Sequence, residues 1–371
     1  MDGGTLRFQK SDGVETDSAS RATPTPFPVI LTCVSRELHP RRTFRISRAR
    51  RTEVRNVFVR LVKDGIAGYG EASPNSFYNE TWKSVTEQLK RASGFIGGLE
   101  VRSIEDIENA WSEAWHLLAP SRAAQCALDV ALWDWFARRE GLSVSELIGK
   151  EAPKPVVTFA TIGLSSAEEL PEKIEELRGF PRIKIKSDAE ASLQAVRQVS
   201  ESGPRLIAVD ANCAWRGLDL NALSKNLEAL GVEFIEQPFP PEFDDLVPDA
   251  GSCLPVMADE SCVTEDDVPR VLEHFAGFNI KLVKCGGITP ARRMAKQGLA
   301  RGKAVMVGCM LESSALIAAG AVIAQRTRYA DLDGAWLIGD DPFYGWRFDH
   351  GTLHPPGGPG LGITPEPGLF L

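Results

Sequence analysis

The strongest constraint on the fold is a regular series of short apolar runs in the second half of the chain. Eight such runs alternate with amphipathic stretches. They cover residues 156–162, 182–186, 206–210, 233–236, 255–259, 278–282, 304–307 and 329–333. Polar residues at positions 186, 210, 236, 259 and 281 end successive runs, at spacings of 24, 26, 23 and 22 residues. This spacing fits one strand, one helix and two loops, so the runs predict a parallel barrel of the TIM type.

The rest of the chain predicts a smaller domain and two terminal segments. Between residues 29 and 150, strand-like runs at 56–62 and 66–71 precede helical periodicity, which indicates an α+β capping domain. Residues 151–345 are expected to form a modified (β/α)7β barrel, because the sequence after Asp333 is too rich in Gly and Pro for a full eighth helix. Residues 346–371 are expected to return to the capping domain, and residues 1–28 to form a mobile tail. The predicted fold class is therefore α/β.

Composition excludes several classes of function. The 371 residues carry 42 basic and 50 acidic side chains, and the net charge of −8 argues against binding to nucleic acid or an anionic membrane. Seven cysteines without a CxxC pair favour a reducing cytoplasm over a disulfide framework. The sequence shows neither an apolar run of about 18 residues nor a secretory signal. We therefore expect a cytoplasmic homo-oligomer that binds a small molecule.

Three successive runs end in carboxylates, namely Asp210, Glu236 and Asp259. A single acidic residue at such a position is often the N-cap of the next helix, and this alternative applies to Asp259. In a parallel barrel, however, the C-terminal ends of the strands meet at one mouth, where catalytic groups lie. Mg²⁺ prefers oxygen ligands, and none of the five histidines lies at these strand ends. The pattern predicts a magnesium site rather than a zinc or iron site.

Lysines end two further runs on opposite sides of the predicted barrel. Lys184 and Lys186 share one strand face, and Lys281 ends the sixth run, whereas Lys284 is assigned to the following loop. Repulsion between neighbouring ammonium groups, together with partial burial, is expected to lower a lysine pKa into the range of a general base. The alternative is that these lysines only extend to solvent. Two opposed bases around a metal-held carboxylate suit the removal of an α-proton on one face and its return on the other.

These motifs carry a family resemblance. The strings KIK, DAN, EQP, ADES and NIKLVKCGG, in this order and spacing, resemble the muconate-lactonizing-enzyme branch of the enolase superfamily. The resemblance extends from about residue 30 to residue 371 and includes a Gly70-Glu71 turn in the capping domain. It implies three Mg²⁺ ligands, two acid/base groups and one residue that supports the substrate carboxylate: Asp210, Glu236 and Asp259; Lys186 and Lys281; and Lys184.

The last two runs resemble those of the dipeptide epimerases, of which the alanyl-glutamate epimerases are best known. Asp331 and Asp333 are two residues apart on one predicted face, where they could hold a substrate ammonium group, although a solvated turn is the alternative. Cys309 and Met310 follow the seventh run and are expected to contact the substrate. The resemblance implies a Mg²⁺-dependent epimerase that inverts the Cα of the C-terminal residue of a dipeptide through a metal-stabilised enediolate.

The preferred side chain depends on arginines of the capping domain. In alanyl-glutamate epimerases an arginine of a capping-domain loop helps bind the glutamate side chain, and the matching position here is Ala49, between Arg48 and Arg50. These two arginines make an acidic second residue the first expectation, as in L-Ala-D/L-Glu. The alternative is that they lie on a solvated edge strand.

Other functions remain open at this point. N-acylamino acid racemases, o-succinylbenzoate synthases and muconate cycloisomerases share the lysines and the metal ligands, but their substrates lack an ammonium group that would pair with Asp331 and Asp333. A sugar-acid dehydratase is less consistent, because that branch commonly needs a histidine on a late strand. A non-catalytic metal-binding or peptide-binding barrel would need the carboxylates but not both bases.

Overall fold

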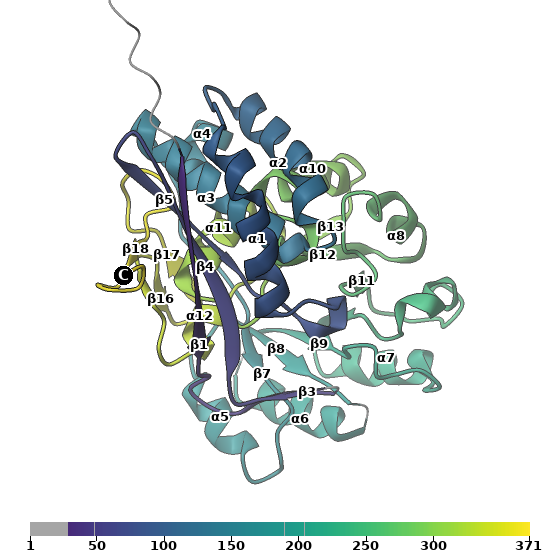
Figure 1. Cartoon of the computed structure of the whole chain (residues 1–371). Helices are drawn as coiled ribbons and strands as arrows, with labels where there is room; N and C mark the ends of the chain where they lie inside the picture. The colour runs from purple at the N-terminus through teal and green to yellow at the C-terminus, as the bar shows by residue number, and fades with distance from the viewer. Residues whose placement is uncertain (1–28, 48, 189, 204) are drawn as a thin grey trace, which may run out of the picture.

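The computed structural model describes residues 29–47, 49–188, 190–203 and 205–371. The predicted tail, residues 1–28, lies outside the described residues. Figure 1 shows a capping domain of purple and blue elements packed on a barrel that runs from teal to yellow-green. Within the described ranges, no helix combines the length and the apolarity that crossing a bilayer requires.

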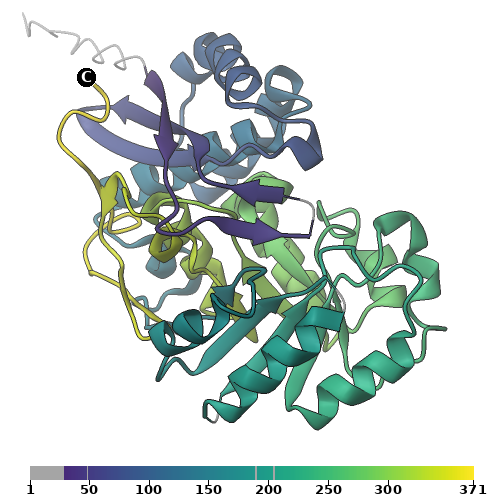
Figure 2. The same cartoon turned by 90° about the horizontal axis from the view of Figure 1, so that it is seen from below.

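The capping domain begins with a three-stranded antiparallel sheet in the order β1-β4-β5. Its strands are β1 (Ile30–Leu38), β4 (Val54–Lys63) and β5 (Ile66–Ala72). Asp64 and Gly65 both have positive φ, 53° and 76°, and Lys63 pairs with Ile66, so two residues close the hairpin. A second hairpin of β2 (Phe44–Ile46) and β3 (Ala49–Arg51) extends from this sheet toward the barrel strands (Figure 2).

Helices cover one side of the sheet. They are η1 (Ser76–Tyr78), α1 (Trp82–Gly97), α2 (Ile104–Leu118), α3 (Arg122–Glu140) and α4 (Val144–Gly149). Helix α3 packs against β5 and is buried around most of its circumference, and it ends at Gly141, whose φ is 70°. A Cβ atom at Gly70 would lie 2.0 Å from the Ala127 carbonyl oxygen of α3. The predicted Gly70-Glu71 turn is therefore wrong: both residues lie within β5, and glycine is required there for close helix packing.

Eight parallel strands form the barrel in sequence order, which confirms the predicted architecture. They are β7 (Ala160–Ile162), β8 (Arg182–Lys186), β9 (Leu206–Asp210), β10 (Val232–Glu236), β11 (Val256–Ala258), β12 (Gly277–Lys281), β13 (Ala304–Gly308) and β14 (Tyr329–Asp331). A backbone hydrogen bond of 2.9 Å from Phe159 N to Ala330 O joins the first and last strands. Apolar side chains fill the interior below the polar strand ends, among them Phe234, Met257 and Met306.

The first predicted run, residues 156–162, divides into two elements. Its beginning forms β6 (Val156–Val157), which pairs with a strand of the C-terminal segment, and only its end forms barrel strand β7. The connections between the barrel strands contain α5 (Leu170–Glu176), α6 (Glu190–Glu201), α7 (Leu220–Ala229), η2 (Pro241–Leu246), α8 (Val268–His274), α9 (Leu282–Cys285), α10 (Ile288–Ala300) and α11 (Ser314–Ala324). After β14 comes only the four-residue helix α12 (Gly334–Leu337), so a full eighth helix is absent from this part of the described chain, as expected.

The C-terminal segment connects the barrel to the capping domain. It contains β15 (Phe343–Tyr344), β16 (Arg347–Asp349), β17 (Thr352–His354) and β18 (Thr364–Pro365). Gly360 donates its N–H to Leu142 O at 2.8 Å and accepts the N–H of Val144 at 2.9 Å. Leu361 N donates to the buried Asp134 carboxylate of α3 at 2.7 Å. These contacts place the end of the chain against the C-terminal end of α3.

Candidate active site

Three carboxylates from neighbouring strands meet at the mouth of the barrel. Asp210 ends β9, Glu236 ends β10, and Asp259 directly follows β11. One carboxylate oxygen of each lies within 4.8 Å of those of the others, and all three side chains are buried. Asp259 is therefore part of this cluster and not the N-cap of the next helix, which is Asp267, because its carboxylate faces two other acids and two lysines.

A lysine lies at each end of this row of carboxylates. Lys186, at the end of β8, donates to Asp210 Oδ2 at 2.5 Å, and Lys281, at the end of β12, donates to Asp259 Oδ2 at 2.7 Å. Strands β8 and β12 are four positions apart in an eight-stranded barrel, so the two lysines approach the row from opposite sides. This is the relative placement that the sequence predicts for them.

The other oxygen of each carboxylate is held by a group from the protein framework. The backbone N–H of Asn212 donates to Asp210 Oδ1 at 2.9 Å, and the Asn279 amide donates to Glu236 Oε1 at 2.7 Å. Lys284 donates to Asp259 Oδ1 at 2.6 Å. The sequence did not indicate Asn279, and the predicted loop position of Lys284 is wrong, because Lys284 lies buried in the four-residue helix α9. The signal for Lys284 was its spacing, since it lies three positions after Lys281 and a single helical turn brings both lysines to one carboxylate.

The close charges shift the pKa values of these acids in different directions. Burial alone would raise the pKa of Asp210 and Asp259, but the neighbouring lysines outweigh it and hold both pKa values below their usual range. Glu236 lies between the other two acids, and burial together with the negative charge of Asp210 raises its pKa to about 7. Asp210 and Asp259, at the two ends of the row next to the lysines, are therefore ionised more readily than Glu236.

Lys184 lies deeper in the barrel and contacts carboxylates on both sides. It donates to Glu236 Oε2 at 3.0 Å and forms a close ion pair with Asp331. The predicted lowering of its pKa by the neighbouring ammonium group is wrong. Burial does lower the pKa of Lys184, but the charges of Asp331, Glu236 and Asp210 outweigh this effect and hold it well above its usual value. In these contacts Lys184 is a cation that holds acidic groups together.

A cavity of about 540 Å³ lies between the capping domain and these strand ends. The capping domain contributes the β2–β3 hairpin and the loop around η1, and the barrel contributes Lys186, Asp259 and Lys281. Of the two arginines proposed for the substrate side chain, Arg48 lies outside the described residues. Arg50 is exposed and does not line the cavity, whereas its neighbours Ala49 and Arg51 do. The alternation of a strand explains the difference, because adjacent side chains point to opposite faces.

The remaining predicted substrate contacts also reach this cavity. Cys309, Met310, Asp331 and Asp333 are among its lining residues. Asp333 lies beyond the end of β14, at the start of α12, and accepts the N–H of Thr161 at 2.6 Å. Burial and the nearby Asp331 raise the pKa of Asp333 to about 7. The buried Oδ1 atom of Asp331 has no hydrogen-bond partner among the described residues. The two aspartates thus form a buried acidic end to the cavity.

The capping domain holds one wall of the cavity by buried hydrogen bonds. Asn56 of β4 donates to Glu71 Oε1 at 2.7 Å and to the carbonyl oxygen of Leu311 at 3.0 Å. Glu71 of β5 also accepts the backbone N–H of Ser313 at 3.0 Å. Leu311 and Ser313 belong to the segment after β13, which carries Cys309 and Met310 into the cavity. The position of this wall therefore depends on a contact between the two domains.

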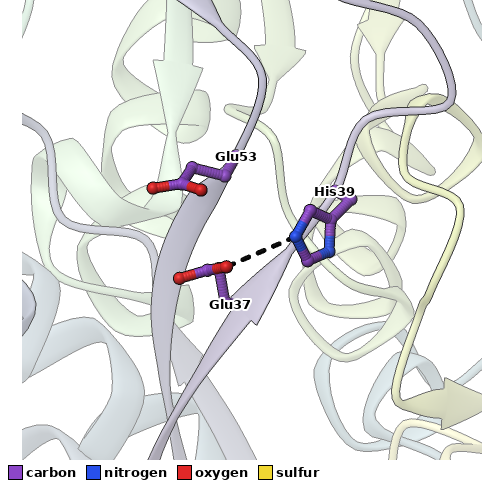
Figure 3. A group of neighbouring side chains, drawn as sticks. All are labelled: Glu37, His39 and Glu53. Carbon is purple, nitrogen blue, oxygen red and sulfur yellow. Dashed lines mark ion pairs between the residues drawn. The ribbon is translucent and has the colours of Figure 1, made fainter.

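A second group of acidic and histidine side chains lies on the capping domain, where Glu37, His39 and Glu53 are close together (Figure 3). These residues are half-buried or exposed. Arg55 donates to Glu37 Oε2 at 2.6 Å, and this hydrogen bond lowers the pKa of Glu37. His39 Nδ1 lies 2.8 Å from Asp340 Oδ2, and that contact raises the pKa of His39. Surface ion pairs account for the proximity of Glu37 and His39 without a bound ion.

Comparisons with known proteins agree with this geometry. Residues 29–149 match the family described as mandelate racemase / muconate lactonizing enzyme, N-terminal domain, and residues 167–368 match the family described as enolase C-terminal domain-like. An L-Ala-D/L-amino acid epimerase of Flavobacterium johnsoniae is 35% identical, over 87% of this chain and 95% of its own length. An L-Ala-D/L-Glu epimerase of Escherichia coli is 33% identical, over 84% of this chain and 95% of its own length.

The fold is also similar to that of a solved dipeptide epimerase structure. A dipeptide epimerase from Methylococcus capsulatus, in complex with Mg and the dipeptide L-Arg-D-Lys, superposes with a TM-score of 0.82 at 32% sequence identity. The match covers 91% of this chain and 99% of that one. Both family matches, these similarities and the row of strand-end carboxylates agree, and the chain belongs to the mandelate racemase/muconate-lactonizing-enzyme family of the enolase superfamily.

Proposed function

We propose that the chain is a Mg²⁺-dependent dipeptide epimerase that inverts the Cα of the C-terminal residue. The observation that carries this proposal is the order of side chains around the barrel mouth, in which a lysine stands at each end of three carboxylates: Lys186, Asp210, Glu236, Asp259 and Lys281. A hard divalent cation fits this row, because all three donors are buried carboxylates whose oxygens already converge. When bound there, Mg²⁺ would supply positive charge beside the substrate carboxylate, which makes its α-proton easier to remove.

Lys186 and Lys281 are proposed to exchange the proton. The neutral Nζ atom of one lysine takes the α-proton: the Cα–H bond breaks, an N–H bond forms, and the electron pair moves toward the substrate carboxylate. The ammonium group of the other lysine then returns a proton to the opposite face of Cα. The configuration is inverted, the two lysines exchange protonation states, and no co-reactant is consumed.

The acidic end of the cavity is proposed to hold the amino group of the dipeptide. A substrate ammonium group would give the unpartnered Asp331 Oδ1 a donor and would favour ionisation of Asp333. This requirement distinguishes a dipeptide from the substrates of N-acylamino acid racemases, o-succinylbenzoate synthases and muconate cycloisomerases, which carry no ammonium group. We expect N-acetylated dipeptides to be poor substrates, and Asp333→Asn to raise KM for free dipeptides. Efficient turnover of N-acyl amino acids would move the assignment to those enzymes.

An acidic side chain on the second residue is the proposed preference, and it rests on Arg51. Arg51 lines the cavity and makes no hydrogen bond or ion pair within the described part of the chain, whereas Arg55 is paired with Glu37. Glu53 also lines the cavity but lies beside His39 (Figure 3). Arg51 is therefore the cation best placed to receive a substrate carboxylate.

The function is tested first by incubating dipeptide mixtures with the protein and Mg²⁺ in D₂O and reading deuterium incorporation at Cα by mass spectrometry. Values of kcat/KM for L-Ala-L-Glu, L-Ala-L-Leu and L-Ala-L-Lys then test the side chain. Arg51→Met should reduce the preference for L-Ala-L-Glu, while the matched variant Arg50→Met, one residue away and outside the cavity, should not. A wild-type preference for L-Ala-L-Lys would reject the role of Arg51.

A further inference from the structure

We propose that Lys284 is a positioning residue for the metal site, which fixes the carboxylate of Asp259 from below and does not reach the substrate. Lys186 and Lys281 line the cavity, whereas Lys284 does not. Its side chain is fully buried beneath the strand ends. The inference rests on the metal site of the proposed function, but it does not depend on which substrate is turned over.

The contacts of Lys284 satisfy its whole ammonium group. Its three N–H donors have three acceptors: Asp259 Oδ1 at 2.6 Å, the Asp259 carbonyl oxygen at 2.6 Å and the Asn279 carbonyl oxygen at 3.1 Å. The backbone N–H of Asp259 is held as well, by Gln237 Oε1 at 2.8 Å. Asp259 is thus restrained at its amide, its carbonyl and one carboxylate oxygen, and the other oxygen alone is turned toward Lys281 and the cavity.

The two oxygens of each of the other carboxylates of the row, Asp210 and Glu236, also have different kinds of partner. Each has one oxygen held by the protein framework and a second oxygen that contacts a lysine amine. The framework donors of Asp210 and Glu236 are neutral amides, whereas that of Asp259 is a charged ammonium group. Lys284 therefore also places one buried positive charge directly beside Asp259.

Charge and position predict opposite effects when Lys284 is replaced. If Lys284 acted only through its charge, its removal would leave a more negative site and Mg²⁺ would bind more tightly. If it acts by holding Asp259, its removal would let the carboxylate turn away and Mg²⁺ would bind more weakly. Groups that orient metal ligands commonly change metal affinity by about 10- to 100-fold. We expect the positional effect to exceed the charge effect, because Lys284 contacts both the backbone and the side chain of Asp259.

The experiment compares two lysines that contact the same carboxylate from opposite sides. Lys284→Met and Lys281→Met each remove one ammonium group from Asp259 and keep an apolar side chain of similar length. The purified full chain is stripped with EDTA, and MgCl₂ is titrated in by calorimetry without any dipeptide. Binding of Mn²⁺, followed by electron paramagnetic resonance, gives a second measurement. We expect Lys284→Met to bind Mg²⁺ about tenfold more weakly than wild type, and Lys281→Met to bind it equally or more tightly.

Each result of these titrations either supports or contradicts the positional role of Lys284. Unchanged or tighter binding by Lys284→Met would overturn the positional role, and so would an equal loss in both variants. Binding of Mg²⁺ by wild type that is too weak to detect would overturn the proposed metal site itself. If circular dichroism shows that Lys284→Met is unfolded, Lys284→Gln takes its place. That variant loses the charge and one of the three N–H donors, and Mg²⁺ affinity equal to or above that of wild type would overturn the proposal.

Discussion

Replacing Asn56 by leucine is the sharpest test of the contact between the two domains. Asn56 is 1% exposed, and its amide joins Glu71 in β5 to the Leu311 carbonyl oxygen in the cavity wall. Leucine has nearly the same size and shape but donates no hydrogen bond. The variant therefore removes two hydrogen bonds while leaving the packing volume almost unchanged.

The expected loss of stability follows from the two bonds. At pH 8, where Glu71 is mostly ionised, a hydrogen bond to its carboxylate contributes about 1.5 to 3 kcal/mol, and one to a carbonyl oxygen about 0.5 to 1.5 kcal/mol. Both acceptors keep a weaker partner, because Ser313 N lies 3.0 Å from Glu71 Oε1 and Ser73 Oγ lies 3.4 Å from Leu311 O. We therefore expect Asn56→Leu to lower the free energy of unfolding by about 3 kcal/mol. We also expect KM for the dipeptide to rise several-fold with Mg²⁺ affinity unchanged, because Asn56 holds the cavity wall and not the carboxylates.

Urea unfolding followed by tryptophan fluorescence measures the first effect, and steady-state kinetics with calorimetric Mg²⁺ titration measures the second. Asn221→Leu is the matched control, since the Asn221 amide donates to Gly251 O at 2.6 Å in an exposed hydrogen bond. That variant should lose less than about 1 kcal/mol. An unfolding midpoint for Asn56→Leu equal to that of wild type, or a loss no larger than that of the control, would refute the reasoning.

Three further predictions concern the site and its charges. EDTA should abolish epimerisation and Mg²⁺ should restore it, and full activity in excess EDTA would reject the proposed magnesium site. Calorimetry should show that Glu236→Gln has lost most of its Mg²⁺ affinity. Lys186→Ala or Lys281→Ala should stop net epimerisation, yet each should still exchange the α-proton of one stereoisomer with D₂O, and wild-type epimerisation by either would reject two opposed bases. Burial raises the pKa of Glu71 to about 7 and that of Glu312 to about 8, above the usual range of a glutamate side chain. These raised values stabilise the folded chain at low pH, and that contribution is lost as pH rises through 7 to 8. As pH is lowered from 8 to 6, the metal-free protein should gain about 1 kcal/mol from Glu71 and about 2 kcal/mol from Glu312. An unfolding midpoint that falls as pH is lowered over this range would contradict the assignment.

The sequence alone determined the architecture and the main row of the site. Short runs at a spacing of 22 to 26 residues are compatible with few folds, and in a parallel barrel every strand end faces the same mouth. The residue that ends a run is therefore placed by topology, without knowledge of any contact. For that reason Lys186, Asp210, Glu236, Asp259 and Lys281 could be brought together from their positions in the sequence.

Only the tertiary structure decided which elements contact one another and in which direction the pKa of a buried lysine shifts. The sequence shows that Lys184 and Lys186 share a face, but not that three carboxylates surround Lys184 and raise its pKa. The hairpin alternation that turns Arg51 into the cavity and Arg50 away from it depends on where the capping domain docks on the barrel. Lys284 contacts Asp259 across 25 residues of chain, and the sequence does not show which carboxylate the helical turn brings it to. Such contacts form between residues that are far apart in the sequence, so they can be found only in the folded chain. The positions of the strand ends follow from the period of the apolar runs, which can be read from the sequence directly.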